Sequence, residues 1–215
     1  MADIFQEVDE EVRKDKATEL WNKYGIYVIA AAVLVIVATT AWVYWKKYTA
    51  EQHQEQGARF EAALELARQG KTAEAATAFR QLAENTSDGV ADLAKLQEAA
   101  QRIADGDTIG AIGVYDSIAA DSGASDLFRQ LATVLSALHQ LDTAGVTEIE
   151  GKLKPLIDRY GPFTHFAKEL LGYAKLKSGD TAGAKELFLS LSDDASAPPG
   201  IRARATEMVS ALGAS

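Results

Sequence analysis

The sequence predicts an all-α protein, in which one membrane-spanning helix is followed by a solenoid of helical hairpins. Three features predict this fold: a long uncharged run near the N-terminus, a helical hydrophobic period in the rest of the chain, and a motif that recurs at intervals of about 36 residues. The composition agrees, because the 215 residues include only four prolines and almost none of the polar and apolar alternation of half-buried strands.

Residues 1–24 form a short charged segment with seven acidic and four basic side chains. Ile4, Val8 and Val12 recur at helical spacing and would form a narrow apolar stripe that could dock on another surface. The density of charge favours the alternative, a partly ordered tail that leads into the next segment.

The segment Gly25–Trp45 contains 21 residues and no charged side chain. At ~1.5 Å rise per residue it forms a helix of about 30 Å, the thickness of the hydrocarbon core of a bilayer. A cleaved secretory signal has a shorter apolar stretch, of roughly 7–15 residues, followed by small residues. A buried core helix is the other alternative, but such helices rarely carry aromatic residues at both ends. We therefore expect residues 25–45 to form a retained transmembrane helix.

Aromatic and basic side chains lie at both ends of this run, at the depth where amphipathic rings and lysines reach the lipid headgroups. The expected membrane-interface anchors are Trp21, Lys23, Tyr24, Tyr27, Trp42, Tyr44, Trp45, Lys46 and Lys47. Four basic residues precede the run and three follow it within a similar distance. The positive-inside rule therefore favours a cytoplasmic N-terminus, with the large C-terminal part outside the cytoplasm.

Residues 46–197 are expected to form a repeat domain. In each copy of the motif a threonine is followed three residues later by a small residue, and four residues after that by an aromatic residue. The small residue allows two helices to approach closely, and the ring fills the space beside it. The repeat-defining pairs are Ala75 and Phe79, Ala111 and Tyr115, and Ala184 and Phe188.

A fourth, degenerate copy is expected midway between the second and third of these pairs. Thr143 completes the series Thr72, Thr108 and Thr181, at intervals of 36, 35 and 38 residues. This register places Glu150 at the aromatic position, so the packing of this unit stays open. Each motif follows another apolar-periodic helix, and the four units therefore predict eight helices.

The C-terminal residues 198–215 are expected to form one more helix. Ile201, Ala205 and Met208 are spaced to lie on one of its faces. A solenoid needs a terminal element that covers the apolar side of its last unit, so we interpret this segment as a capping helix.

The offsets of the small and aromatic residues resemble those of the tetratricopeptide repeat family, whose units are about 34 residues long. The last unit also carries Leu171 and Gly172, thirteen and twelve residues before Ala184, as the family pattern requires. The resemblance covers about residues 50–192. It implies stacked helical hairpins with a curved surface that binds proteins.

The sequence offers no catalytic constellation. His53, His139 and His165 lie in separate units, without ligand spacing or any cysteine to complete a metal site. The run Gly106–Gly113 has the glycines of a phosphate loop but lacks the GKS/T ending and the preceding strand. We therefore expect no catalytic residue, no cofactor and no metal. The alternative, a membrane-anchored enzyme, would need a cluster of titratable residues that the sequence does not show.

Protein is the partner class that the sequence favours, together with the lipid bilayer. Residues 48–215 contain 16 Lys and Arg against 24 Asp and Glu, and this acidic balance repels nucleic acid. Stacked helix pairs suit a peptide or a protein better than a small-molecule substrate. One segment is rich in aromatic residues and is a possible partner groove. Its aromatic residues are Tyr160, Phe163, Phe166 and Tyr173. The alternative is that these rings serve only to pack the third and fourth repeats together.

The whole chain resembles the family of ancillary SecYEG translocon subunits, the YfgM-like membrane proteins of bacteria. The resemblance rests on the short acidic tail, on Trp21 four residues before Gly25, on the aromatic segment Trp42–Trp45 and on the size of the repeat domain. It implies a single-pass inner-membrane protein with its N-terminus in the cytoplasm and its repeat domain in the periplasm. It also implies association with a SecYEG-type channel and with periplasmic chaperones. The alternative is an envelope-assembly or chaperone-docking protein unrelated to the translocon.

Overall fold

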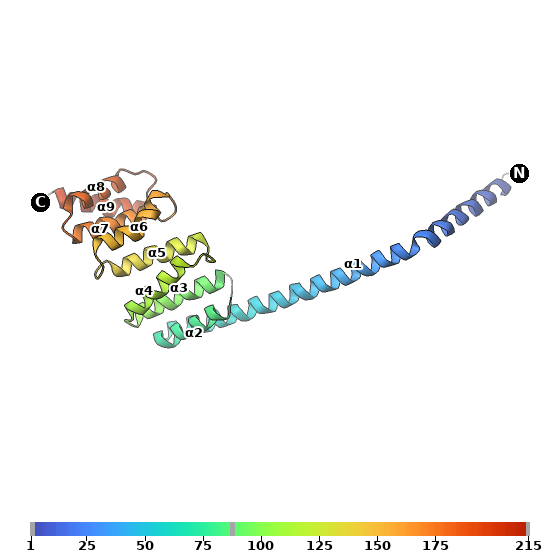
Figure 1. Ribbon diagram of the computed structural model, residues 1–215, viewed down its shortest axis with the longest axis horizontal. Coiled ribbons are helices and arrows are strands. Elements are labelled where there is room, and N and C mark those ends of the chain that lie inside the picture. The colour runs from blue at the N-terminus through green and yellow to red at the C-terminus, as the bar shows by residue number, and fades with distance from the viewer. Residues whose placement is uncertain (1–2, 87–88, 214–215) are drawn as a thin grey trace. The chain divides into compact units, whose positions relative to one another are not determined.

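The computed structural model describes residues 3–86 and 89–213, and within the first helix it leaves out the side chains of residues 3–17, 19 and 28. All regular secondary structure in the described residues is helical, which confirms the predicted fold class (Figure 1). The helices are α1 Asp3–Arg68, α2 Thr72–Glu84, α3 Gly89–Ala104, α4 Thr108–Ala120, α5 Asp126–Gln140, α6 Val146–Asp158, α7 Thr164–Lys177, α8 Thr181–Ser192 and α9 Pro199–Gly213. The stripe expected at Ile4, Val8 and Val12 lies outside the described side chains.

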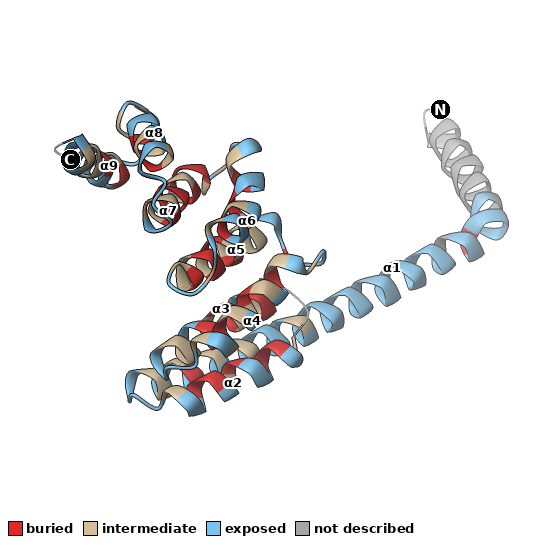
Figure 2. Ribbon diagram, turned by 60° about the vertical axis from the view of Figure 1, so that its left-hand side comes forward, coloured by how far each residue is buried: buried red, intermediate tan, exposed pale blue. Residues whose placement is uncertain are grey.

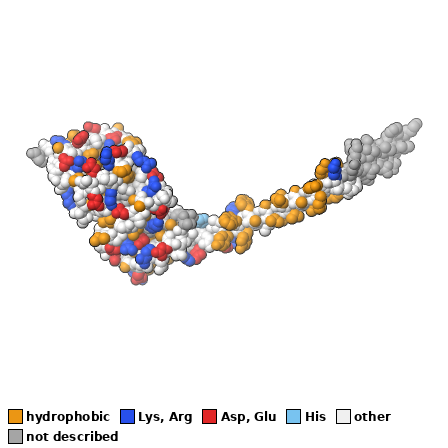
Figure 3. All heavy atoms as spheres, in the orientation of Figure 1, with side chains coloured by type: hydrophobic (Ala, Val, Ile, Leu, Met, Phe, Trp, Pro, Cys, Tyr) orange, Lys and Arg blue, Asp and Glu red, His pale blue; other side chains and the backbone are white. Residues whose placement is uncertain are grey.

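The chain divides into two compact units, Met1–Glu55 and Gln56–Ser215. The first consists of the N-terminal part of α1. Its apolar side chains are exposed, as Figures 2 and 3 show for the described residues. The segment Leu20–Arg68 is the one described helix that is long and apolar enough to cross a membrane, with a mean hydropathy of 2.4 over its most apolar window and none of that window buried.

Polar groups within the apolar run are satisfied by the helix itself. The hydroxyls of Thr39 and Thr40 donate to the carbonyls of Val35 and Ile36, at 2.7 and 2.8 Å. Such bonds remove the cost of placing a hydroxyl in hydrocarbon. The run can therefore enter lipid despite its two threonines.

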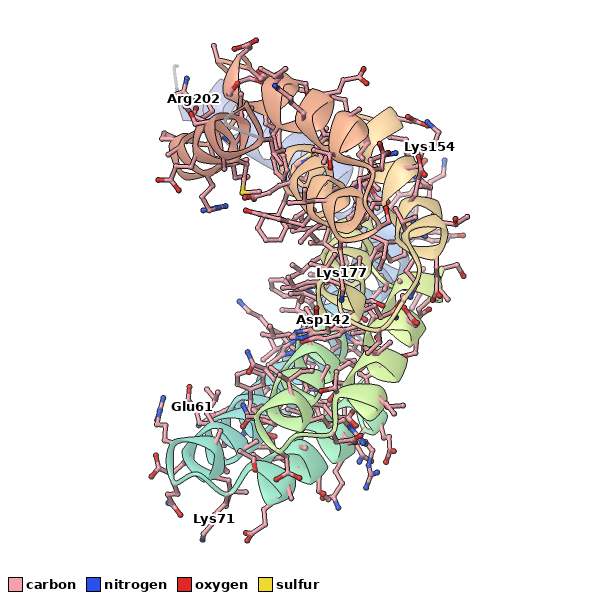
Figure 4. All side chains as sticks on the ribbon, turned by 90° about the vertical axis from the view of Figure 1, so that its left-hand side faces the viewer. Glu61, Lys71, Asp142, Lys154, Lys177 and Arg202 are labelled. Carbon is pink, nitrogen blue, oxygen red and sulfur yellow. The ribbon has the colours of Figure 1, made fainter. Side chains whose placement is uncertain are left out.

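The second unit is a stack of helices in which each helix packs against its neighbours in the chain. Figure 4 shows this unit as a curved stack that begins at the end of α1 and closes with α9. Its apolar interior consists of four successive clusters. Each cluster joins the two helices of one hairpin to the first helix that follows it. This arrangement is that of a solenoid, in which each unit buries its apolar face against the next.

The recurring motif lies in the buried interior of three helical hairpins. Thr72, Thr108 and Thr181 each begin the second helix of a hairpin. The residues three and seven positions further on are the predicted pairs, and all of them are at most 3% exposed: Ala75 and Phe79, Ala111 and Tyr115, Ala184 and Phe188.

The third repeat, which comprises α5 and α6, departs from the predicted register. Thr143 does not begin a helix: its backbone N–H donates to the carbonyl of Gln140 in a turn, and α6 begins at Val146. The turn between α5 and α6 comprises residues 141–145 and is two residues longer than the corresponding turns of the other units. Ile149 and Leu153 therefore occupy the small and aromatic positions, and both are at most 1% exposed.

The last helix, α9, covers the end of the stack. Ile201 and Ala205 are buried against Phe188 and Leu191 of α8, and Met208 packs at the edge of the same cluster. This is the capping arrangement that the sequence predicts. An ion pair adds to it, because Arg204 on α9 donates to both carboxylate oxygens of the buried Glu169 on α7, at 2.7 and 2.8 Å.

Candidate protein-binding surface

The expected membrane-interface anchors are exposed on α1. Trp21, Trp42 and Trp45 are each more than half exposed. Two lysines lie over neighbouring rings: Nζ of Lys23 is 5.5 Å from the centre of the Tyr24 ring, and Nζ of Lys46 is 5.7 Å from the centre of the Trp42 ring. Trp21 also packs over Gly25, where an added Cβ would lie 3.3 Å from the indole ring.

The three histidines lie in different surroundings. His139 stacks on Tyr115, with ring centres 6.0 Å apart, and burial lowers the pKa of His139. Nε2 of His165 lies 2.9 Å from Oδ2 of Asp194, whereas His53 is exposed on α1. Within the described residues, no group of three or more His, Cys, Asp or Glu side chains could hold a metal ion.

The four rings of the predicted groove do not share one surface. Tyr173 packs edge-on against Phe188, with ring centres 5.2 Å apart, and Phe166 contacts the same cluster. Phe163 is partly buried against the core between α6 and α7. Of the four residues, only Tyr160 is mostly exposed, at 64%. A binding role for the other three rings stays a prediction.

A surface pocket of about 450 Å³ lies between α4, α5, α6 and the loop that follows α6. We call it the α5–α6 pocket. Its charged residues are Arg129 and Asp126 of α5, Lys152 of α6 and Arg159 at the end of α6. The sequence did not predict this group of cations, because Arg129 and Arg159 are 30 residues apart and belong to no common motif.

A polar network fixes one wall of the α5–α6 pocket. Nζ of Lys152 donates to both carboxylate oxygens of Asp116 on α4, at 2.8 and 3.0 Å, and to Oγ of Ser136 on α5, at 3.0 Å. Ser136 also donates to Asp116, at 2.6 Å. Because these bonds join α4, α5 and α6, which belong to two successive repeats, they hold α6 in a fixed position over α5.

The rim of the pocket is formed by the loop between α6 and α7. Tyr160 lies there with φ of 45°, and its hydroxyl bonds to Oγ of Ser196, at 3.0 Å, in the loop between α8 and α9. Ser196 donates to Asp194 from both its hydroxyl and its backbone N–H. These two bonds, with the contact from His165, lower the pKa of Asp194 to about 2.

The sequence matches the tetratricopeptide repeat-like domain family over residues 18–190. The chain belongs to this family. No curated protein and no solved structure matches the chain.

The family match covers both the apolar run and most of the repeat domain. In this tetratricopeptide repeat-like chain the matched region begins ahead of the apolar run and ends within α8. Repeat domains of this class are typically non-catalytic scaffolds that present a surface to other proteins.

Proposed function

We propose that this protein is a membrane-anchored scaffold of the bacterial protein-export machinery, which binds a SecYEG-type channel and periplasmic chaperones. One observation supports the scaffold part of the proposal: the family match spans both an exposed apolar helix and a stack of tetratricopeptide-like repeats. A helix of this kind holds the domain at a membrane, and a solenoid offers a large surface to partners.

The translocon part of the proposal rests on the resemblance of the whole chain to YfgM-like proteins. Trp21 and Gly25, which contribute to that resemblance, are in contact, since the indole ring covers the glycine. This contact places an aromatic ring over the helix backbone at the expected membrane boundary. Helices associate within lipid through van der Waals packing of their side chains, so we infer that the exposed Trp21 ring contacts another transmembrane helix.

The proposed orientation places the N-terminus in the cytoplasm and the repeat domain in the periplasm of a bacterial inner membrane. The excess of basic residues before the apolar run supports this orientation. In it, the repeat domain can meet chaperones and emerging substrates, while the anchor can meet the channel.

Affinity purification in mild detergent, followed by mass spectrometry, tests the proposal. The full-length protein is expected to recover components of the export channel and periplasmic chaperones. A matched control replaces residues 25–45 with an artificial Leu/Ala span of equal length, which keeps the domain at the membrane but removes the specific surface of the anchor. This control is expected to lose the channel and keep the chaperones.

Two other results would change the conclusion. Recovery of other envelope proteins in place of channel components would favour the alternative envelope-assembly scaffold. Recovery of neither channel nor chaperone components, from membranes in which the protein is abundant, would contradict the export assignment.

A further inference from the structure

We propose that the α5–α6 pocket binds an acidic segment of a partner protein that also carries an aromatic or aliphatic side chain. This inference rests on the proposed scaffold function and adds to it the site and the chemistry of the partner.

The charge of the pocket is opposite to that of the domain around it. Three cations, Arg129, Lys152 and Arg159, line it against one acid, Asp126, and a second acid, Asp116, is paired with Lys152 from outside the lining. Residues 48–215 as a whole have an excess of eight acidic side chains. Most of the domain therefore repels an acidic segment, whereas the pocket attracts one.

The two arginines have donors to spare. Nη2 of Arg129 donates to Oδ1 of Asp126 at 2.9 Å, and Nη1 of Arg159 lies 3.9 Å from the same atom. A guanidinium carries five N–H donors, so these exposed pairs leave donors for a second carboxylate. Lys152 is different, because Asp116 and Ser136 hold its ammonium group. We infer that the arginines contact the partner and that Lys152 positions the wall.

The pocket also has an apolar part. Ala119, Pro155, Leu156 and Pro162 contribute to its walls beside the arginines. A purely acidic ligand would leave this surface in contact with water. A segment that places an aliphatic or aromatic side chain next to its acid would cover it and gain from its burial.

The backbone of Tyr160 adopts a conformation that is unusual for a residue other than glycine. The described residues with φ in the left-handed region are Gly70, Gly106 and Gly179, with φ of 74°, 88° and 87°, and Tyr160, with φ of 45°. Glycine adopts this conformation without strain, whereas a tyrosine does not. At the end of α6 the chain thus carries a ring where glycine would be more stable. Retained strain of this kind is characteristic of functional positions.

The Tyr160 ring is exposed but held in place. Its hydroxyl bonds to Ser196, and His165 lies against it edge-on, with ring centres 6.0 Å apart. A fixed, exposed ring at the rim of a pocket offers contact area at a low cost in conformational entropy. We infer that Tyr160 covers the apolar side chain of the bound segment.

Selection from a phage-displayed library of random heptapeptides tests this inference. The bait is the full-length protein in phosphatidylcholine nanodiscs. The comparison baits are Arg129→Gln/Arg159→Gln, Tyr160→Gly and, as the matched control, Lys154→Gln. Lys154 is an exposed cation of α6 that does not line the pocket and projects outward from the stack in Figure 4.

The selected peptides are expected to be enriched in Asp and Glu next to aromatic or aliphatic residues. Recovery should fall at least about tenfold on the double arginine variant and on Tyr160→Gly, and change less than about twofold on Lys154→Gln. Recovery should also fall when the salt concentration is raised. Thermal unfolding of Tyr160→Gly at or above the wild-type midpoint would show that its loss of binding does not come from unfolding.

Peptides without an acidic excess, or no selected peptides at all, would overturn the inference. Recovery that survives the arginine and tyrosine substitutions would do the same. None of these results would contradict the scaffold function, which depends on the recovery of channel and chaperone components.

Discussion

Gly172 on α7 lies directly against the ring of Phe188 on α8: a Cβ added to Gly172 would be 2.8 Å from Cζ of that ring. Phe188 is fully buried. The absence of a side chain at residue 172 therefore sets the approach of the two helices in the last hairpin.

Gly172→Ala is expected to destabilise the repeat domain. Alanine favours a helix over glycine by about 0.5–1 kcal/mol, but overpacking of a core costs about 1–3 kcal/mol, so we expect a net loss of about 1–2 kcal/mol. Urea unfolding of residues 56–215 measures it. Gly151→Ala is the matched control, since a Cβ at Gly151 meets nothing within 4 Å. Gly151→Ala should be neutral or stabilising, and the same behaviour of Gly172→Ala would contradict the packing described.

Leu153 and Glu150 distinguish the two possible registers of the third unit. Leu153 is fully buried, whereas Glu150 is only partly buried on the same helix. Leu153→Ala should lower the free energy of unfolding by about 2–5 kcal/mol, and Glu150→Ala by less than about 0.5 kcal/mol. The reverse order in urea unfolding would restore the register that begins at Thr143.

Asp194 should make the stability of the domain depend on pH in the acid range. Its pKa is lowered from the ordinary 3.8 to about 2 by the Ser196 hydroxyl, the Ser196 backbone N–H and His165. The folded state thus favours the charged form, and this stabilisation is present above pH 4 and is lost as the pH falls from about 4 towards 2. In Asp194→Asn it should be absent at every pH.

Unfolding curves at pH 5 and pH 2.5 measure this effect. The wild type should lose more free energy of unfolding between the two pH values than Asp194→Asn does. Asp193→Asn, a substitution of the exposed neighbouring acid, should behave like the wild type. Equal losses in wild type and Asp194→Asn would contradict the described contacts of Asp194.

The sequence was sufficient to predict the helical hairpins where a short-range pattern sets the packing. Ala75 with Phe79 and Ala184 with Phe188 are such cases, because the two residues share one helix face. In the third unit, however, the length of the turn decides the register. Gly145, which precedes α6 and is its N-cap residue, was the signal that could have corrected it.

The α5–α6 pocket was not predictable in the same way. Its cations come from two helices, and the bonds of Lys152 to Asp116 bridge 36 residues. The left-handed conformation of Tyr160 also depends on how the loop closes against Ser196, 36 residues further on. Such arrangements follow from the stacking of units rather than from any local pattern.

The central claim is that residues 25–45 anchor the chain in a membrane and display the repeat domain outside the cytoplasm. Protease treatment of intact spheroplasts tests it most directly, with antibodies against the two ends of the chain. We expect residues 50–215 to be digested and the N-terminal tail to be spared, and lysed spheroplasts to lose both. Protection of residues 50–215 in intact spheroplasts would contradict the claim, since the domain could then meet no periplasmic partner.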